Sequence, residues 1–202
     1  VGPFGPARGF KEAGVHRKEA LDQGLLCAKA LRYAVEVMDA VPIDAYGQVN
    51  QKEATAVLHL REPGQPAVIC VQLGAPMLNI QRPEAEILYE VGRLATSLRA
   101  RRVLRTLLPT AAQLGMIIDA AIAMNGDPLA AQGRVAETLA GLRKSLSPAV
   151  QEQVAQMGKG LREAGIKGEP VAASWLAYAD ITAARAGLVL CGDLEVVATM
   201  MA

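Results

Sequence analysis

The sequence predicts an α+β fold that is mostly α-helical, with helices packed around a small β-sheet. Over most of the chain, apolar residues recur three or four positions apart, which is the period of a half-buried helix. At about Thr55 the period changes to two, as in strands, and residues 54–73 read as two strands around a Pro-Gly turn. Half of the residues are apolar but only 3% are aromatic, so we expect a core of Ala, Leu, Val and Ile.

The first part of the chain is expected to form an arm, a helix and two strands, in that order. Residues 1–10 are rich in Gly and Pro, which predicts a linker or extended arm, and residues 11–202 are expected to form a single domain. Apolar residues line one face of a helix predicted from Lys11 to Ala40. Two strands are predicted at Ala54–Leu60 and Ala67–Leu73. The second is apolar on both faces, as expected of a central strand.

The second part of the chain is expected to be entirely helical. A helix is predicted over Glu84–Arg101, with acidic residues in its first turn and arginines toward its end, as the helix dipole favours. Thr110 is expected to cap the next helix. The remaining helices are predicted at about 111–124, 129–144, 148–164 and 171–190, and from Asp193 onward.

Composition excludes several classes of protein. The net charge of +1 argues against a chain that binds polyanions as a whole. Cys27, Cys70 and Cys191 lie far apart in apolar runs, which favours buried thiols over a disulfide framework or a cysteine-based zinc site. No apolar run reaches the ~18 residues needed to cross a bilayer, and no signal peptide is recognised, so we expect a cytoplasmic protein. The first residue is Val1 rather than Met, and a fragment of a longer protein stays one of the open alternatives.

Two local patterns carry a resemblance to a known family. EAEILYEVG, at 84–92, opens a helix directly after a predicted strand, and DITAARAGLVLCGD, at 180–193, lies late in the chain. In this order of elements the chain resembles the HtpX-like gluzincin metallopeptidases over residues 15–100 and 171–200. In that family two histidines of a His-Glu-x-x-His helix and a glutamate of a later helix bind zinc, and the glutamate between the histidines is the general base.

The residues that define this chemistry are replaced here. The two histidine positions hold Arg93 and Ser97, the general-base position holds Leu94, and the third-ligand position holds Asp180. The resemblance therefore implies a degenerate zinc site with no catalytic residue, no metal and no cofactor. The chain looks most like the degenerate members that accompany tetratricopeptide-repeat proteins in some bacteria. This implies an interaction or scaffold module whose partners are proteins of a larger assembly or a repeat domain of the same protein.

The residue types also argue against a zinc hydrolase site when the family is left aside. A zinc hydrolase site needs three protein ligands and an open position, but the only two histidines, His16 and His59, lie far apart in the sequence. Arg93 places a cation where a metal would have to bind. An ion pair between Arg93 and Asp180 would replace zinc as the link between their two helices. The alternative is that Arg93 reaches solvent and Asp180 caps a local group.

Other chemistries have weaker support. The serines have no nucleophile-elbow context, and there is no phosphate-binding loop. Arg99, Arg101, Arg102 and Arg105 form a basic contact patch, but without interleaved aromatic residues a solvated helix end is favoured over a nucleic-acid site. Two alternatives to the scaffold function remain, a hydrolase with an unrecognised active site and a helical adaptor unrelated to peptidases. A sheet at 54–73 would argue against the purely helical adaptor.

Overall fold

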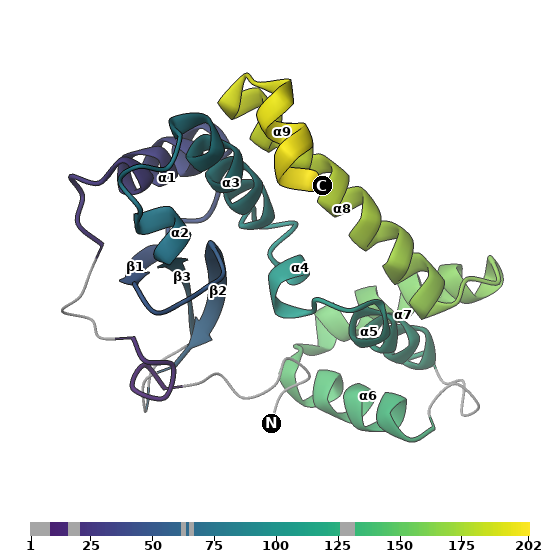
Figure 1. Cartoon of the computed structure of the whole chain (residues 1–202). Helices are drawn as coiled ribbons and strands as arrows, with labels where there is room; N and C mark the ends of the chain where they lie inside the picture. Colours follow the sequence, from purple (N-terminus) through teal and green to yellow (C-terminus); the bar gives the residue numbers. More distant parts are fainter. Residues whose placement is uncertain (1–8, 16–20, 62–63, 65–66, 126–131) are drawn as a thin grey trace. The chain divides into compact units, whose positions relative to one another are not determined.

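The computed structural model describes residues 9–15, 21–61, 64, 67–125 and 132–202. The chain divides into two compact units, which are described separately here (Figure 1). The sheet unit combines Ala7–Leu107 with Ala179–Ala202, and the helical unit includes Leu108–Tyr178. The single domain over residues 11–202 stays a prediction. Most of the predicted N-terminal arm, residues 1–8, lies outside the described residues.

The described elements confirm an α+β fold that is mostly α-helical. The sheet unit contains α1 (Leu26–Val37), β1 (Asp44–Gln48), β2 (Thr55–Leu60), β3 (Val68–Gly74), α2 (Ala75–Leu78), α3 (Glu84–Ser97), α4 (Leu104–Leu107) and α9 (Leu194–Met201). The helical unit contains α5 (Ala111–Ala123), α6 (Arg134–Ser145) and α7 (Pro148–Glu163). The long helix α8 (Gly168–Cys191) begins in the helical unit and continues into the sheet unit after Tyr178. None of the helices in the described ranges is both long and apolar enough to cross a membrane.

The three strands form one mixed sheet in the order β1-β3-β2. β2 runs antiparallel to β3, and β1 runs parallel to it. The two predicted strands and the central place of the second are therefore confirmed. The sequence did not predict β1. Its five residues, Asp-Ala-Tyr-Gly-Gln, include no β-branched residue, and three of them (Asp, Ala and Gly) are types that are depleted in strands.

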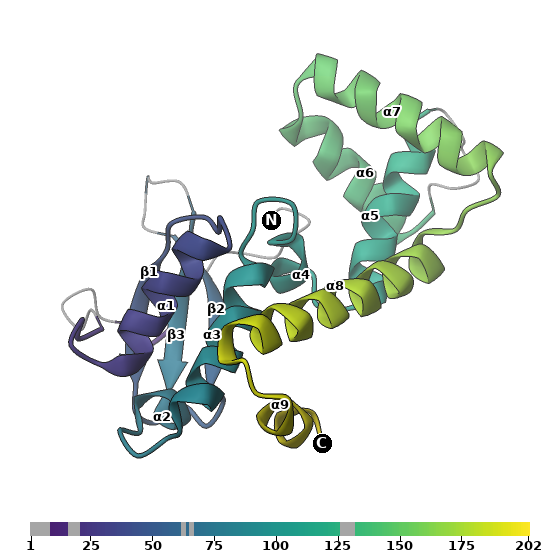
Figure 2. The same cartoon turned by 90° about the horizontal axis from the view of Figure 1, so that it is seen from above.

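The two faces of the sheet carry separate clusters of buried side chains. On one face α1 and α3 lie side by side (Figures 1 and 2) and form the main core with the strands. This core includes Leu31 and Ala34 of α1, Val71 and Leu73 of β3, and Ile87, Val91, Leu94 and Leu98 of α3. The opposite face holds a smaller cluster around Tyr46, against which Phe10 stands edge-on with 6.4 Å between ring centroids. The predicted packing of the two strands on the helix at 84–101 is thus confirmed.

The first helix begins much later than the predicted start at Lys11. Residues 9–15 form a turn, residues 16–20 lie outside the described part, and α1 begins only at Leu26. The backbone N–H of Leu21 donates to the carbonyl of Ala45, which holds this segment against β1. Asp22 then accepts from the N–H of Gly24 at 2.8 Å, a local bond of the kind that competes with helix formation.

The helical unit is packed through small residues. α5 begins as predicted, because Thr110 and Gln113 form a reciprocal capping box. Gly158 of α7 lies against α5 so closely that a Cβ would sit 2.2 Å from the carbonyl oxygen of Ala121. Asp119 of α5 accepts from the N–H of Gly168 at 2.9 Å, which fixes the start of α8. Close approach of backbones, rather than large side chains, therefore holds these helices together.

Candidate functional site

The four positions singled out by the resemblance lie on α3 and on the part of α8 that belongs to the sheet unit. These helices touch at Gly92 and Gly187. A Cβ at Gly92 would lie 2.9 Å from the Cα of Gly187, and one at Gly187 would lie 2.5 Å from a ring carbon of Tyr89. Both distances are shorter than real Cβ contacts, so the two helices meet backbone to backbone. This contact fixes which residues of α8 stand opposite each turn of α3.

Leu94, at the general-base position, is part of the main core. Its side chain is 6% exposed and packs with Ile87, Val91 and Leu98 of the same helix in the cluster that covers the sheet. The side chain therefore faces the layer between α3 and the sheet. A carboxylate at this position would have to lose its hydration without gaining a partner.

Arg93, at the first histidine position, lies over an aromatic ring. Its guanidinium carbon is 5.5 Å from the centroid of Tyr89, a cation–π distance. The Nε atom of Arg93, the hydroxyl of Tyr89 and the hydroxyl of Thr96 are all buried and have no hydrogen-bond partner among the described residues. The spacing of four and three positions places these side chains on one face of α3. They form a polar stripe on the face of the helix that meets α8 at Gly187.

Ser97 and Asp180 are both engaged elsewhere. The hydroxyl of Ser97, at the second histidine position, donates to the carbonyl oxygen of Arg93 at 3.0 Å. The carboxylate of Asp180 accepts two bonds from Arg105, from Nε at 2.9 Å and from Nη2 at 3.2 Å. This is a bidentate ion pair between the segment after α3 and α8.

The predicted ion pair between Arg93 and Asp180 is therefore wrong. The contact between Gly92 and Gly187 sets the register of the two helices. Asp180 lies seven residues before Gly187, about 10 Å along the helix axis. At this distance from the contact, Asp180 pairs with Arg105, which follows the end of α3. Arg93 lies in the next-to-last turn of α3. The sequence could not reveal this register, because it depends on the close glycine contact.

The described residues do not assemble a metal site. No three or more His, Cys, Asp and Glu side chains within the described ranges are grouped closely enough to hold a metal ion. His59 lies on β2 opposite Ile69, and His16 lies outside the described residues. Among the cysteines, Cys27 and Cys70 are buried and Cys191 is partly so. Burial raises the pKa of the Cys27 thiol, which disfavours the reactive thiolate.

The basic patch predicted at the end of α3 is divided by the structure. α3 ends at Ser97 instead of continuing to Arg101, and a turn follows in which the N–H of Arg102 donates to the carbonyl of Arg99 at 2.7 Å. Arg105 pairs with Asp180. The other three arginines line a cavity of about 300 Å³ with Asp39 and Ala100. The sequence identified these arginines, but not the turn that gathers them.

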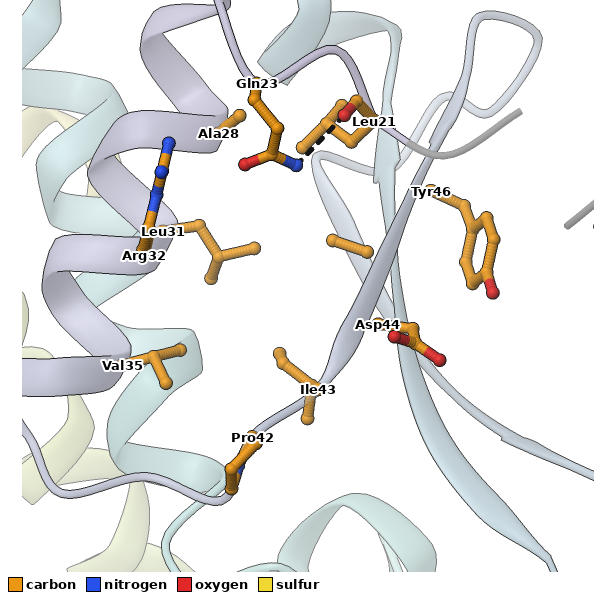
Figure 3. A pocket seen from close by; sticks show the side chains of 11 residues that line it. Leu21, Gln23, Ala28, Leu31, Arg32, Val35, Pro42, Ile43, Asp44 and Tyr46 are labelled. Atoms are coloured by element: carbon orange, nitrogen blue, oxygen red, sulfur yellow. Dashed lines mark hydrogen bonds between the residues drawn. The ribbon is translucent and has the colours of Figure 1, made fainter. Parts of the chain in front are cut away.

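A second cavity of about 350 Å³ lies between α1 and β1 (Figure 3). Its walls include Leu31, Arg32 and Val35 of α1 and Ile43 before β1. Gln23 donates to the carbonyl of Leu21 at its rim, as the dashed line in Figure 3 shows. The remaining lining residues are Ala28, Pro42, Asp44, Ala45 and Tyr46. A wall that is mostly apolar and contains no Ser, Cys or His is suited to binding rather than to covalent chemistry. Because the cavity depends on β1, it was not predicted.

No protein-family model, curated protein or solved structure matches this chain.

Proposed function

We propose that the chain is a non-catalytic pseudo-metallopeptidase domain that serves as an interaction or scaffold module in a larger protein assembly. One observation carries the proposal, namely that each of the four positions of the degenerate site makes a structural contact. Leu94 fills the core and Arg93 lies over Tyr89. Ser97 bonds to its own helix, and Asp180 pairs with Arg105. We infer that these side chains stabilise the sheet unit and do not form a catalytic site.

An exposed apolar stripe on α1 supports the interaction role. Leu26, Tyr33 and Val37 are 41%, 55% and 52% exposed. Their spacing of seven and four positions places them on one side of the helix, which we call the α1 stripe. Ile80, which is 88% exposed, shares a small hollow with Leu26. Apolar side chains grouped on a surface in this way are characteristic of protein-binding faces.

The proposed partners are a repeat domain of the same protein or another member of a cytoplasmic assembly. Of the two alternatives, a purely helical adaptor is at odds with the three-stranded sheet. The hydrolase alternative gains no specific support from the cavities, since neither wall contains a residue arrangement for nucleophilic attack.

Metal analysis tests the loss of catalysis. After dialysis against a metal-free buffer, the purified protein is expected to hold far less than one equivalent of zinc. Any casein hydrolysis in the preparation is expected to be unchanged by 1,10-phenanthroline, because Arg93 and Ser97 cannot supply the imidazole ligands. A full equivalent of tightly held zinc, or hydrolysis that the chelator abolishes, would overturn the proposal.

Site-specific cross-linking tests the interaction role. A photoreactive p-benzoylphenylalanine at Tyr33 is expected to give one discrete cross-linked protein in cells that express the full-length product. The same probe at Met157 on α7, which is 70% exposed against 55% for Tyr33, serves as the control. The cross-link at Tyr33 should disappear when Leu26 and Val37 are both changed to Ser. A cross-link that survives these changes, or that appears equally at Met157, contradicts docking on the α1 stripe.

A further inference from the structure

We propose that the cavity lined by Asp39, Arg99, Ala100, Arg101 and Arg102, here called the arginine pocket, binds an acidic peptide segment of a protein partner. The inference rests on the proposed function and names the chemistry of the partner, a stretch rich in Asp and Glu. All five lining residues belong to the sheet unit. The volume of about 300 Å³ has room for more than a single small ion.

The backbone of the pocket is held in place by hydrogen bonds. Its two walls are the segments that follow α1 and α3, and the N–H of Val41 donates to the carbonyl of Leu98 at 3.3 Å between them. Within the second wall, the carbonyl of Arg99 accepts from the N–H groups of Arg102 and Val103 at 2.7 and 2.9 Å. The arginine side chains therefore extend from a fixed turn, which limits the entropy lost on binding.

The arginine side chains are free to take a ligand. Arg99, Arg101 and Arg102 form no ion pair and no side-chain hydrogen bond within the described residues. The Nη1 atom of Arg102 is buried and still has no partner among them. A buried guanidinium N–H without an acceptor is unfavourable, and an incoming carboxylate removes that penalty. The planar fork of arginine matches the two oxygens of a carboxylate.

The rest of the wall favours a peptide over a compact oxyanion. Asp39 places a carboxylate beside the three guanidinium groups, and both walls follow helix C-termini, which carry partial negative charge. These groups repel a phosphate dianion, whereas the carboxylate of Asp39 can accept a hydrogen bond from an N–H donor. A peptide supplies both carboxylates for the arginines and a backbone N–H for Asp39.

The same wall argues against nucleic acid. None of the lining residues is aromatic, so the pocket offers no surface on which a base could stack. The net charge of +1 also gives little long-range attraction for a polyanion. An acidic protein segment is the occupant that fits the arginines, the carboxylate and the lack of aromatic side chains together.

Fluorescence anisotropy with defined probes tests the inference on the full chain. The probe is a fluorescein-labelled peptide containing four consecutive glutamates, and its matched control contains four glutamines. Binding of the glutamate peptide alone is expected. Arg102→Gln should weaken it about tenfold, and Arg101→Gln with Arg102→Gln about a hundredfold, as expected for the loss of charge-assisted hydrogen bonds. Arg162→Gln, which removes the same charge from an exposed position on α7, should change affinity less than twofold.

Competition separates the possible sources of negative charge. Inorganic phosphate and a single-stranded oligonucleotide should displace the peptide no better than their ionic strength explains. Equal binding of the glutamine peptide, equal loss in Arg162→Gln, or stronger binding of phosphate or oligonucleotide would overturn the proposal. If Arg102→Gln melts early by circular dichroism, Arg101→Gln alone carries the test. If the unmodified chain does not bind the glutamate peptide but Tyr33 still gives its cross-link, only the pocket is refuted. If the peptide binds but Tyr33 gives no cross-link, only docking on the α1 stripe is refuted.

Discussion

The two units of this chain solve the same packing problem in different ways. The core of the sheet unit is filled by branched side chains between a helical layer and a sheet, such as Leu73, Ile87 and Leu94. In the helical unit one cluster of buried residues consists of Ala120, Ala123, Met124 and Leu139. There, Gly158 and Gly115 let helix backbones approach each other directly. A chain with few aromatic residues can thus bury surface either by filling the gap between elements or by closing it.

The helix α3 packs through side chains on one side and through direct backbone contact on the other. Toward the sheet, it presents a continuous apolar face that includes Leu94. Toward α8, it makes a glycine contact and leaves the polar atoms of Tyr89, Arg93 and Thr96 without partners among the described residues. Leu94 therefore lies on the first side and Arg93 on the second. The packing of the helix separates the two residues that the proposed resemblance compares with a general base and a zinc ligand.

The largest expected effect comes from a carboxylate in the filled core. Leu94→Glu should destabilise the sheet unit by about 4 kcal/mol or more, because the charge loses its hydration without a partner. Leu94→Met, which keeps an apolar side chain of similar volume, should cost less than ~1.5 kcal/mol. Urea unfolding followed by circular dichroism measures both. A glutamate tolerated as well as methionine would mean that this side chain faces solvent, as it would in an active-site cleft.

A smaller loss of stability is expected where the backbones of two helices are in direct contact. Gly158→Ala should destabilise the helical unit by about 3 kcal/mol, because its Cβ would lie 2.2 Å from the carbonyl oxygen of Ala121 and α7 would have to shift. Gly160, two positions along the same helix, has no atom within 4 Å of an added Cβ.

The second glycine provides the matched control. Gly160→Ala should stabilise the same unit by ~0.5–1 kcal/mol through its higher helix propensity. Thermal melting of both variants measures the difference in sign. If both alanine variants are stabilised, α5 and α7 do not approach closely. The helical unit would then not differ from the sheet unit in the way its elements pack.

Sequence patterns identified the parts of this fold that depend on neighbours in the chain. The strand patterns at residues 54–60 and 67–73, the periodic face of α3 and the cap at Thr110 are all local signals, and the structure contains the elements they predict. β1 was missed because its place in the sheet comes from pairing with β3, since its own residues have weak strand preference. The sequence identified the residues of the candidate site but not their contacts. Those contacts depend on how the packing of Gly92 against Gly187 aligns α3 with α8, and no local sequence pattern determines this alignment.

The ion pair between Arg105 and Asp180 gives the smallest and most specific test of that alignment. The side chains are 27% and 54% exposed, so water screens the pair and weakens its net contribution. Its bidentate geometry nevertheless favours one arrangement of the two segments. A double-mutant cycle with Arg105→Ala and Asp180→Ala should give a coupling free energy of ~0.5–1 kcal/mol by urea unfolding.

The matched cycle replaces Arg105→Ala with Arg93→Ala and keeps Asp180→Ala. It should be additive within ~0.3 kcal/mol, because Arg93 makes its contact with Tyr89 and not with Asp180. Raised salt should reduce the first coupling and leave the second near zero, since only the first reports a solvent-screened charge pair. If the coupling instead appears between Arg93 and Asp180, α8 must slide along α3 by about two turns. The contact between Gly92 and Gly187 could not survive such a shift, so this small coupling reports directly on the helix crossing that keeps Arg93 and Asp180 apart.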